Sequence, residues 1–162
     1  MKKIVKLLSF IIIIGSILVS SVGCSFLNRE PKDKTFTLNG FSITLTDEFV
    51  EQDIITQSAM YVSEDVLVTT LREYDSSIKN YTVRKYAQLV CDVNKLKSTV
   101  RVVGDYAEFE YEKDSGGKDI HFYARCYKGA KFFWLVQFGC EVDEVDEHMP
   151  DIKKWADTIS VD

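Results

Sequence analysis

Side chains able to perform acid–base or nucleophilic chemistry are sparse in this chain. Its 162 residues include two histidines, His121 and His148, and four cysteines. A Ser-His-Asp or Cys-His arrangement needs a histidine beside its nucleophile, and no nucleophile motif accompanies either histidine. The sequence also lacks a glycine-rich phosphate loop. It therefore predicts a protein that is not an enzyme and that uses no cofactor.

A cluster of carboxylates precedes the last predicted helix, and its members are Asp143, Glu144, Asp146 and Glu147. The cluster lacks the Asp/Asn alternation and the glycine of an EF-hand calcium loop. The dipole of a helix favours acidic side chains at its N-terminus, which accounts for the cluster without a metal. We therefore predict no metal site, and an enzyme with an acidic site of unrecognised type remains an alternative.

A better candidate for a binding site is a set of polar residues on neighbouring predicted strands. The Gly116-Gly117 turn sets Glu108 opposite Arg125 and Glu110 opposite Tyr123. The other face of the same two strands is apolar. This division is typical of an antiparallel sheet that has one solvated face.

The following turn decides which residues of the next strand, Lys131 to Cys140, join the polar face. We expect a loop of odd length around Gly129-Ala130, because it keeps Trp134 and Phe138 on the apolar face and a slip of one residue would expose them. The candidate binding face then holds Glu108, Glu110, Tyr123, Arg125, Tyr127 and Gln137. Tyr and Arg are common in contact surfaces. Two alternatives are a solvated face whose Glu-Arg pairs each contribute less than about 1 kcal/mol, and a face covered by the second helix.

The first 24 residues have the order of an export signal. Three lysines within the first six residues precede the apolar run from Leu7 to Val19, and small residues lead to Gly23-Cys24. This order resembles a bacterial lipobox, in which the cysteine sulfur is acylated and the chain is cut just before it. Ser21 stands where such a motif usually has Leu. The resemblance implies a signal peptide over residues 1–23 and a lipid on Cys24.

An uncleaved membrane anchor is the alternative to cleavage. Residues Leu7 to Leu27 carry no charge and reach the length of about 20 residues that spans a bilayer, whereas the serines near the end of the run favour cleavage. In both cases the lysines stay on the cytoplasmic side. We therefore predict a protein attached to the cell membrane and facing outward, with residues 24–34 as a lipidated cysteine and tether.

The remaining chain has the size of one domain and an acidic charge. Removal of residues 1–23 leaves 139 residues with 17 basic and 25 acidic side chains, a net charge of −8. This charge disfavours nucleic acid and anionic lipid as partners, because both need clustered Lys and Arg. The other three cysteines, Cys91, Cys126 and Cys140, show no CxxC spacing. We expect them to be buried thiols, and one disulfide with one free thiol stays open.

Turn signals and hydrophobic periodicity divide residues 35–162 into strands and two helices. The predicted elements are strands over Thr35 to Leu38 and Phe41 to Leu45, strands over Ser58 to Ser63 and Val66 to Glu73, a helix from Val83 to about Lys97 with Thr82 as N-cap, four strands within residues 99–140, a helix over Glu144 to Asp157, and a short edge strand over Thr158 to Val161. Pro150 suggests that the first residues of the last helix are loop. The fold class is α+β, with an antiparallel sheet of about six to eight strands and two main helices packed on it.

Three segments carry a resemblance to a known fold family: FTLNGFSITLTDEF, KFFWLVQFGC and WADTISV. They match the opening hairpin, the aromatic late strand and the terminal helix and strand of the PsbP-like α/β/α sandwich, which occurs in the photosystem extrinsic protein and in many bacterial lipoproteins. The chain resembles this group from Thr35 to Val161. The resemblance implies a non-enzymatic role and carries no functional residue to this chain.

The predicted function is a non-enzymatic binding or accessory role for a membrane-anchored lipoprotein that faces the cell envelope. An envelope protein is the expected kind of partner. Besides the enzyme, the second alternative is a carrier that holds a small hydrophobic ligand inside the sandwich.

Overall fold

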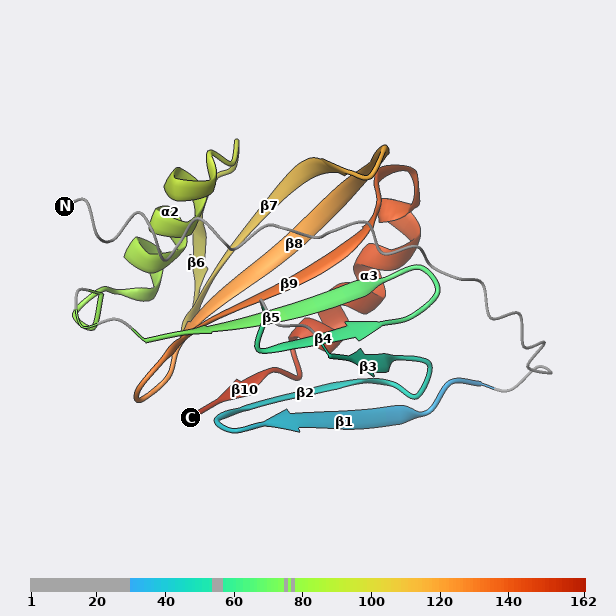
Figure 1. The fold of residues 1–162 in the computed structure, drawn as a ribbon, viewed down its shortest axis with the longest axis horizontal. Helices are drawn as coiled ribbons and strands as arrows, with labels where there is room; N and C mark the ends of the chain where they lie inside the picture. Colours follow the sequence, from blue (N-terminus) through green and yellow to red (C-terminus); the bar gives the residue numbers. More distant parts are fainter. Residues whose placement is uncertain (1–29, 54–56, 75, 77) are drawn as a thin grey trace.

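The computed structural model describes residues 30–53, 57–74, 76 and 78–162. They form two antiparallel sheets and two α-helices, which confirms the predicted α+β class (Figure 1). The predicted signal peptide, Cys24 and the first part of the tether lie outside the described residues. Neither described helix combines the length and the hydropathy of a membrane span.

The smaller sheet joins the beginning of the domain to its end. Its strands, in the order β1-β2-β10, are β1 (Asp33–Leu38), β2 (Phe41–Thr46) and β10 (Ser160–Val161). Leu38 pairs directly with Phe41, so Asn39-Gly40 is a two-residue hairpin turn, and Gly40 has a φ of +83°. The hairpin and the short last strand were both predicted, and the structure shows that they belong to one sheet.

The larger sheet holds the remaining seven strands in the order β3-β4-β5-β9-β8-β7-β6. They are β3 (Val50–Gln52), β4 (Ala59–Val62), β5 (Leu67–Glu73), β6 (Arg101–Val103), β7 (Tyr106–Ser115), β8 (Lys118–Lys128) and β9 (Phe133–Glu141). Strand β3 was not predicted. Strand β9 ends the meander and pairs with β5, so it lies in the middle of the sheet and connects the meander to the second hairpin.

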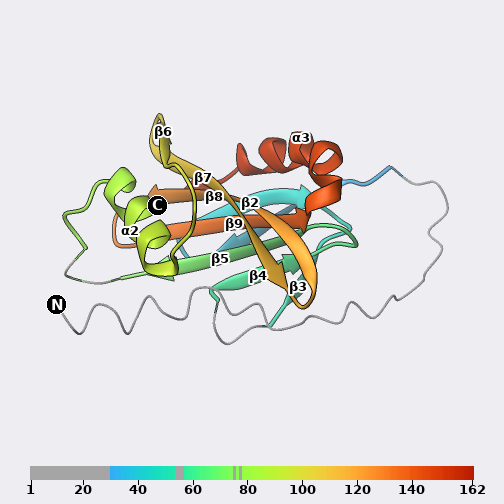
Figure 2. The ribbon, with the colours of Figure 1, turned by 90° about the horizontal axis from the view of Figure 1, so that it is seen from above.

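A helix covers each face of the larger sheet. Helix α2 (Val83–Asn94) buries Tyr86, Ala87 and Val90 in one core cluster with Phe109 and Phe122 of the sheet. Helix α3 (Val145–Ala156), which follows a 3-10 turn over Val142–Glu144, packs in the other cluster together with the small sheet. The two helices lie at opposite ends of the strands (Figure 2). The result is a sandwich with the larger sheet as its middle layer.

The ends of the helices follow local chemistry. Thr82 caps α2 as predicted, because its Oγ1 accepts a hydrogen bond from the Lys85 N–H at 3.2 Å. At the other end Lys95 adopts a left-handed φ of +55°, so the helix ends at Asn94, three residues before Lys97. Helix α3 includes Pro150, so the expectation that its first residues form a loop is wrong.

The register of β9 corrects the sequence-based expectation of an odd loop. Lys128 pairs with Phe133, so the connecting loop is residues 129–132, which is an even length. Trp134 and Phe138 therefore share a face with Tyr127 and Tyr123, their direct partners. The expectation failed because it assumed that one face of the sheet is solvated. Both faces are covered, so β9 is apolar on both sides and hydrophobicity does not select its register.

The cysteines confirm the expectation of buried thiols. Cys91, Cys126 and Cys140 are all buried and free of disulfides. Burial is the main reason that the pKa of Cys91 and of Cys140 is raised to about 11. These thiols stay protonated at neutral pH and act as small apolar side chains.

Candidate functional site

The structure buries most of the candidate binding face that the sequence predicted. Glu110 alone of the six residues is exposed, and the buried five are Glu108, Tyr123, Arg125, Tyr127 and Gln137. The pairing of β7 with β8 is the predicted one, with Glu108 opposite Arg125 and Glu110 opposite Tyr123. The expectation that this face meets solvent is therefore wrong.

Gln137 lies on the opposite face of the sheet, as a result of the even loop before β9. Its Oε1 accepts a hydrogen bond from the Tyr111 hydroxyl at 2.7 Å, and its Nε2 donates to Thr69 Oγ1 at 3.3 Å. Gln137 thus satisfies its polar atoms within the α2 side of the core. It is separated by the sheet from the group it was predicted to join.

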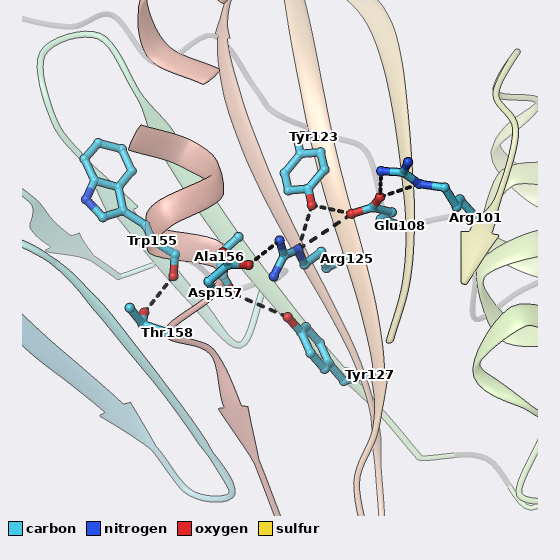
Figure 3. Close-up of polar contacts among 9 residues, drawn as sticks. All are labelled: Arg101, Glu108, Tyr123, Arg125, Tyr127, Trp155, Ala156, Asp157 and Thr158. Atoms are coloured by element: carbon cyan, nitrogen blue, oxygen red, sulfur yellow. Dashed lines mark hydrogen bonds and ion pairs between the residues drawn. The ribbon is translucent and has the colours of Figure 1, made fainter. Parts of the chain in front are cut away.

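Polar groups on the other face form a chain of hydrogen bonds and ion pairs, whose middle is buried and whose ends, Arg101 and Asp157, are exposed (Figure 3). The Tyr123 hydroxyl donates to Glu108 Oε2 at 2.5 Å and accepts from Arg125 Nε at 2.7 Å. Arg101 of β6 donates to Glu108 Oε1 through both Nε, at 2.7 Å, and Nη2. Arg125 Nη2 donates to Asp157 Oδ1 at 2.7 Å. These hydrogen bonds and ion pairs therefore connect β6, β7 and β8 to Asp157, the residue that follows α3.

Each charged group of this network is paired with a group of opposite charge. Burial by itself would raise the pKa of Glu108, but hydrogen bonds from Tyr123 and Arg101 and the nearby guanidinium charges hold it below its ordinary value. Burial and the hydrogen bond to Glu108 raise the pKa of the Tyr123 hydroxyl, which therefore remains a proton donor. The Arg125 guanidinium lies 4.3 Å from the centroid of the Tyr106 ring. This pairing of each group with partners of its own chain fits a structural role.

Helix α3 covers this part of the sheet. Asp157 pairs with Arg125, and the Ala156 carbonyl accepts a hydrogen bond from the Tyr127 hydroxyl at 3.5 Å. Ile152 and Ala156 are buried in the same cluster as Tyr127. Of the three sequence-based interpretations, coverage by the second helix is the one that the structure confirms. The physical reason is that the apolar stripe of α3 needs a surface, and α2 already occupies the other face.

An open hollow of about 650 Å³ lies between the end of α2 and the exposed part of β7. Strand β6 pairs with Tyr106 to Glu108, and among the described residues no strand pairs with the rest of β7 on that side. The hollow is lined by Asn94, Lys95, Leu96, Lys97, Glu110, Tyr111, Glu112, Lys113 and His121. Of this group, sequence analysis included only Glu110 in the candidate binding face. The residues at the end of α2 were missed because they reach the hollow through tertiary packing.

Side chains that can carry charges of both signs line this hollow. His121 Nε2 lies 3.2 Å from Glu110 Oε2, and its Nδ1 lies 3.8 Å from Glu112 Oε1. The ring is mostly buried, whereas both carboxylates are exposed. Lys95 and Lys97 contribute exposed ammonium groups from the end of the helix. The lining is suited to a polar partner that carries charges of both signs.

A third polar group brings together residues from distant segments. Asp65, in the turn between β4 and β5, lies beside Glu144 and His148 at the beginning of α3. Glu144 belongs to the acidic cluster noted in the sequence. Two other members, Asp146 and Glu147, lie in the first turn of α3, as the helix-dipole interpretation expects.

Comparison with known proteins shows the fold but no family. No protein-family model and no curated protein sequence matches this chain. The solution structure of cyanobacterial PsbP (CyanoP) from Synechocystis sp. PCC 6803 is similar, with a TM-score of 0.60 and 14% identity over 92% of this chain and 99% of that chain. A crystal structure of a Bacteroides thetaiotaomicron VPI-5482 protein is similar with a TM-score of 0.54 and 8% identity, over 75% of this chain and 45% of that chain. The domain therefore has a PsbP-like fold, as the three sequence segments predicted.

Proposed function

We propose that this protein is a lipid-anchored accessory protein on the outer face of the cell membrane, where it binds another envelope protein without catalysing a reaction. The observation that carries the proposal is the order of segments in the chain. An uncharged apolar run ends at Gly23-Cys24, a short polar tether follows, and β1 of the folded domain begins at Asp33. Such an order attaches a domain to a membrane surface and leaves it free to meet partners there.

The hollow beside α2 is the surface at which we propose partner binding. Its charged lining favours a polar partner over the small hydrophobic ligand of the carrier alternative. The buried network around Glu108 supports the non-enzymatic role, because its groups are paired with one another. The fold likeness to cyanobacterial PsbP supports the proposal as far as the shape of the domain is concerned.

The anchor is tested by metabolic labelling with a fatty-acid analogue. Cys24→Ala removes the sulfur that would be acylated, so we expect the label to disappear and an unprocessed chain to accumulate. Ser25→Ala is the matched control and should keep the label. Undiminished labelling of the Cys24→Ala chain would refute lipidation at this position.

Partner binding is tested by chemical crosslinking in membranes of the native organism. The double variant Lys95→Glu/Lys97→Glu reverses two exposed charges at the hollow, so we expect it to lose a crosslinked product of the wild-type chain. Lys153→Glu/Lys154→Glu is the matched control, because it reverses two exposed charges on α3. Equal crosslinking by both variants, or equal loss, would reject the hollow as the binding surface.

A further inference from the structure

Three side chains with metal-binding atoms converge beside the start of α3, and none of them lines the hollow. Asp65, Glu144 and His148 each place one ligand atom within 4.8 Å of the others. Asp65 comes from the β4–β5 turn, whereas the other two come from the junction of the 3-10 turn and α3. The convergence joins segments that are far apart in the sequence.

The donor set is that of a transition-metal site. One imidazole nitrogen with two carboxylate oxygens is a ligand set used for zinc and other first-row divalent ions. Calcium prefers six to eight oxygen ligands and has no preference for imidazole. The participation of His148 therefore separates this group from a simple acidic cluster.

The spacing of the helical pair also suits a shared ion. His148 Nε2 lies 3.6 Å from Glu144 Oε2, an ion-pair distance across one turn of the helix. Two ligands at tetrahedral positions around zinc, each about 2.1 Å from the metal, are about 3.4 Å apart. The two atoms thus need to move little to bind one ion.

The group is partly buried, and hydrogen bonds fix the turn that carries Asp65. The His148 side chain is 17% exposed and that of Glu144 is 41% exposed, so the group lies at the edge of the core with an opening to solvent. In the turn that carries Asp65, Ser63 Oγ donates to the Val66 carbonyl and accepts from its N–H, both at 3.1 Å.

The charges near the group favour the binding of a cation. Asp146 and Glu147 add negative charge beside the group. Lys118 is a cation that interacts with Glu144, and its ammonium group donates a hydrogen bond to Glu141. The local charge therefore remains negative and attracts a divalent cation.

We propose that Asp65, Glu144 and His148 bind one divalent transition-metal ion, with Zn²⁺ as the representative, and that water completes its coordination. Three protein ligands with an open position are the arrangement of an accessible zinc site. A metal bound by both segments would connect the β4–β5 turn to the start of α3.

The test is titration of Zn²⁺ into the full chain, purified in detergent without a polyhistidine tag and freed of metal with a chelator. Isothermal titration calorimetry should show one Zn²⁺ bound per chain. His148→Gln and Asp65→Asn should each weaken binding by roughly tenfold or more, since even residues that only support a ligand have effects of that size. His121→Gln removes the other histidine and should leave the affinity unchanged.

Other outcomes would overturn the proposal. They are an absence of saturable Zn²⁺ binding in the wild-type chain, unchanged affinity in His148→Gln, and equal loss of affinity in His121→Gln. Ca²⁺ binding that equals Zn²⁺ binding and survives His148→Gln would also overturn it. Thermal melting in the presence of chelator checks that each variant folds. If His148→Gln does not fold, the Zn²⁺ affinity of Asp65→Asn, a change in an exposed turn, tests the proposal.

Discussion

Glu108 shows how a charged residue is accommodated on a covered sheet face. Its carboxylate accepts hydrogen bonds from Tyr123 and Arg101, and Arg125 Nε lies 4.0 Å from it. A buried charge costs free energy unless it is paired in this way. The same three partners lower the pKa of Glu108, so the folded state favours the ionised form and its stability depends on pH.

Glu108→Gln should destabilise the domain by about 1–3 kcal/mol at neutral pH, because it weakens hydrogen bonds to charged groups. The folded pKa lies below the ordinary value of 4.5, so the contribution of the ionised form is complete above about pH 4.5 and is lost as the pH falls through the folded value. Urea unfolding at a series of pH values should show the difference between wild type and variant shrinking below about pH 4.5. Glu110→Gln, on the exposed part of β7, is the control, and a pH-independent difference would contradict the prediction.

Gly139 is required by the ring that lies against it. A Cβ added at this position would be 2.8 Å from a ring carbon of Phe122, its direct partner on β8. Gly139→Ala should therefore destabilise the domain by about 1–3 kcal/mol through overpacking, as measured by thermal melting. Phe122→Leu combined with Gly139→Ala should recover part of this loss relative to the two single changes. Strictly additive effects would show that the ring is not the cause.

At the scale of elements, each helix is determined by its cap and by the sheet face that it covers. Helix α2 has a local start signal at Thr82 and a partner surface that includes Phe109 and Phe122. Helix α3 has no side-chain hydrogen bond at its N-cap. Its position depends instead on the burial of Ile152 and Ala156 and on the Arg125–Asp157 pair.

Thr82→Ala should cost about 1 kcal/mol, because the Lys85 N–H at the start of α2 loses its side-chain acceptor. Thr82→Ser keeps the hydroxyl and should retain most of the stability. Chemical denaturation of the two variants checks the prediction. Equal stability of Thr82→Ala and wild type would mean that the packing of Tyr86 and Val90 alone determines where the helix starts.

At the scale of the whole molecule, Trp134 connects the two sheets. Its ring is fully buried and stacks on Phe41 of the small sheet at a centroid distance of 5.2 Å. Because Phe41 pairs with Val161 of β10, this contact connects the middle of the large sheet to both ends of the domain. Trp134 and Phe138 are core residues, as the sequence predicted, although the register that led to this prediction was wrong.

Trp134→Ala should destabilise the domain by about 3–5 kcal/mol, as expected when a large aromatic side chain is removed from a packed core. The loss should exceed that of Tyr74→Ala, since Tyr74 is 69% exposed. Differential scanning calorimetry of both variants checks this comparison. A similar small effect for both would indicate that the small sheet does not depend on Trp134.

Local patterns in the sequence determined the hairpins at Asn39-Gly40 and Glu64-Asp65, the capped helix α2, the β7–β8 register and the α+β fold class. In each of these cases the signal lies within a few residues, either as a turn preference or as one apolar periodicity. Sequence analysis did not predict β3, which is only three residues long.

Only the tertiary structure decided what covers each face of the sheet. The polar residues around Arg125 were predicted to form a solvated surface, because the sequence does not state where α3 packs. Strand β9 is apolar on both sides. Burial on both faces removed the alternation from which a register is inferred. The hollow beside α2 and the group of Asp65, Glu144 and His148 join residues that local patterns do not relate. Such groups arise when distant segments pack together, and for that reason they were found in the structure and not in the sequence.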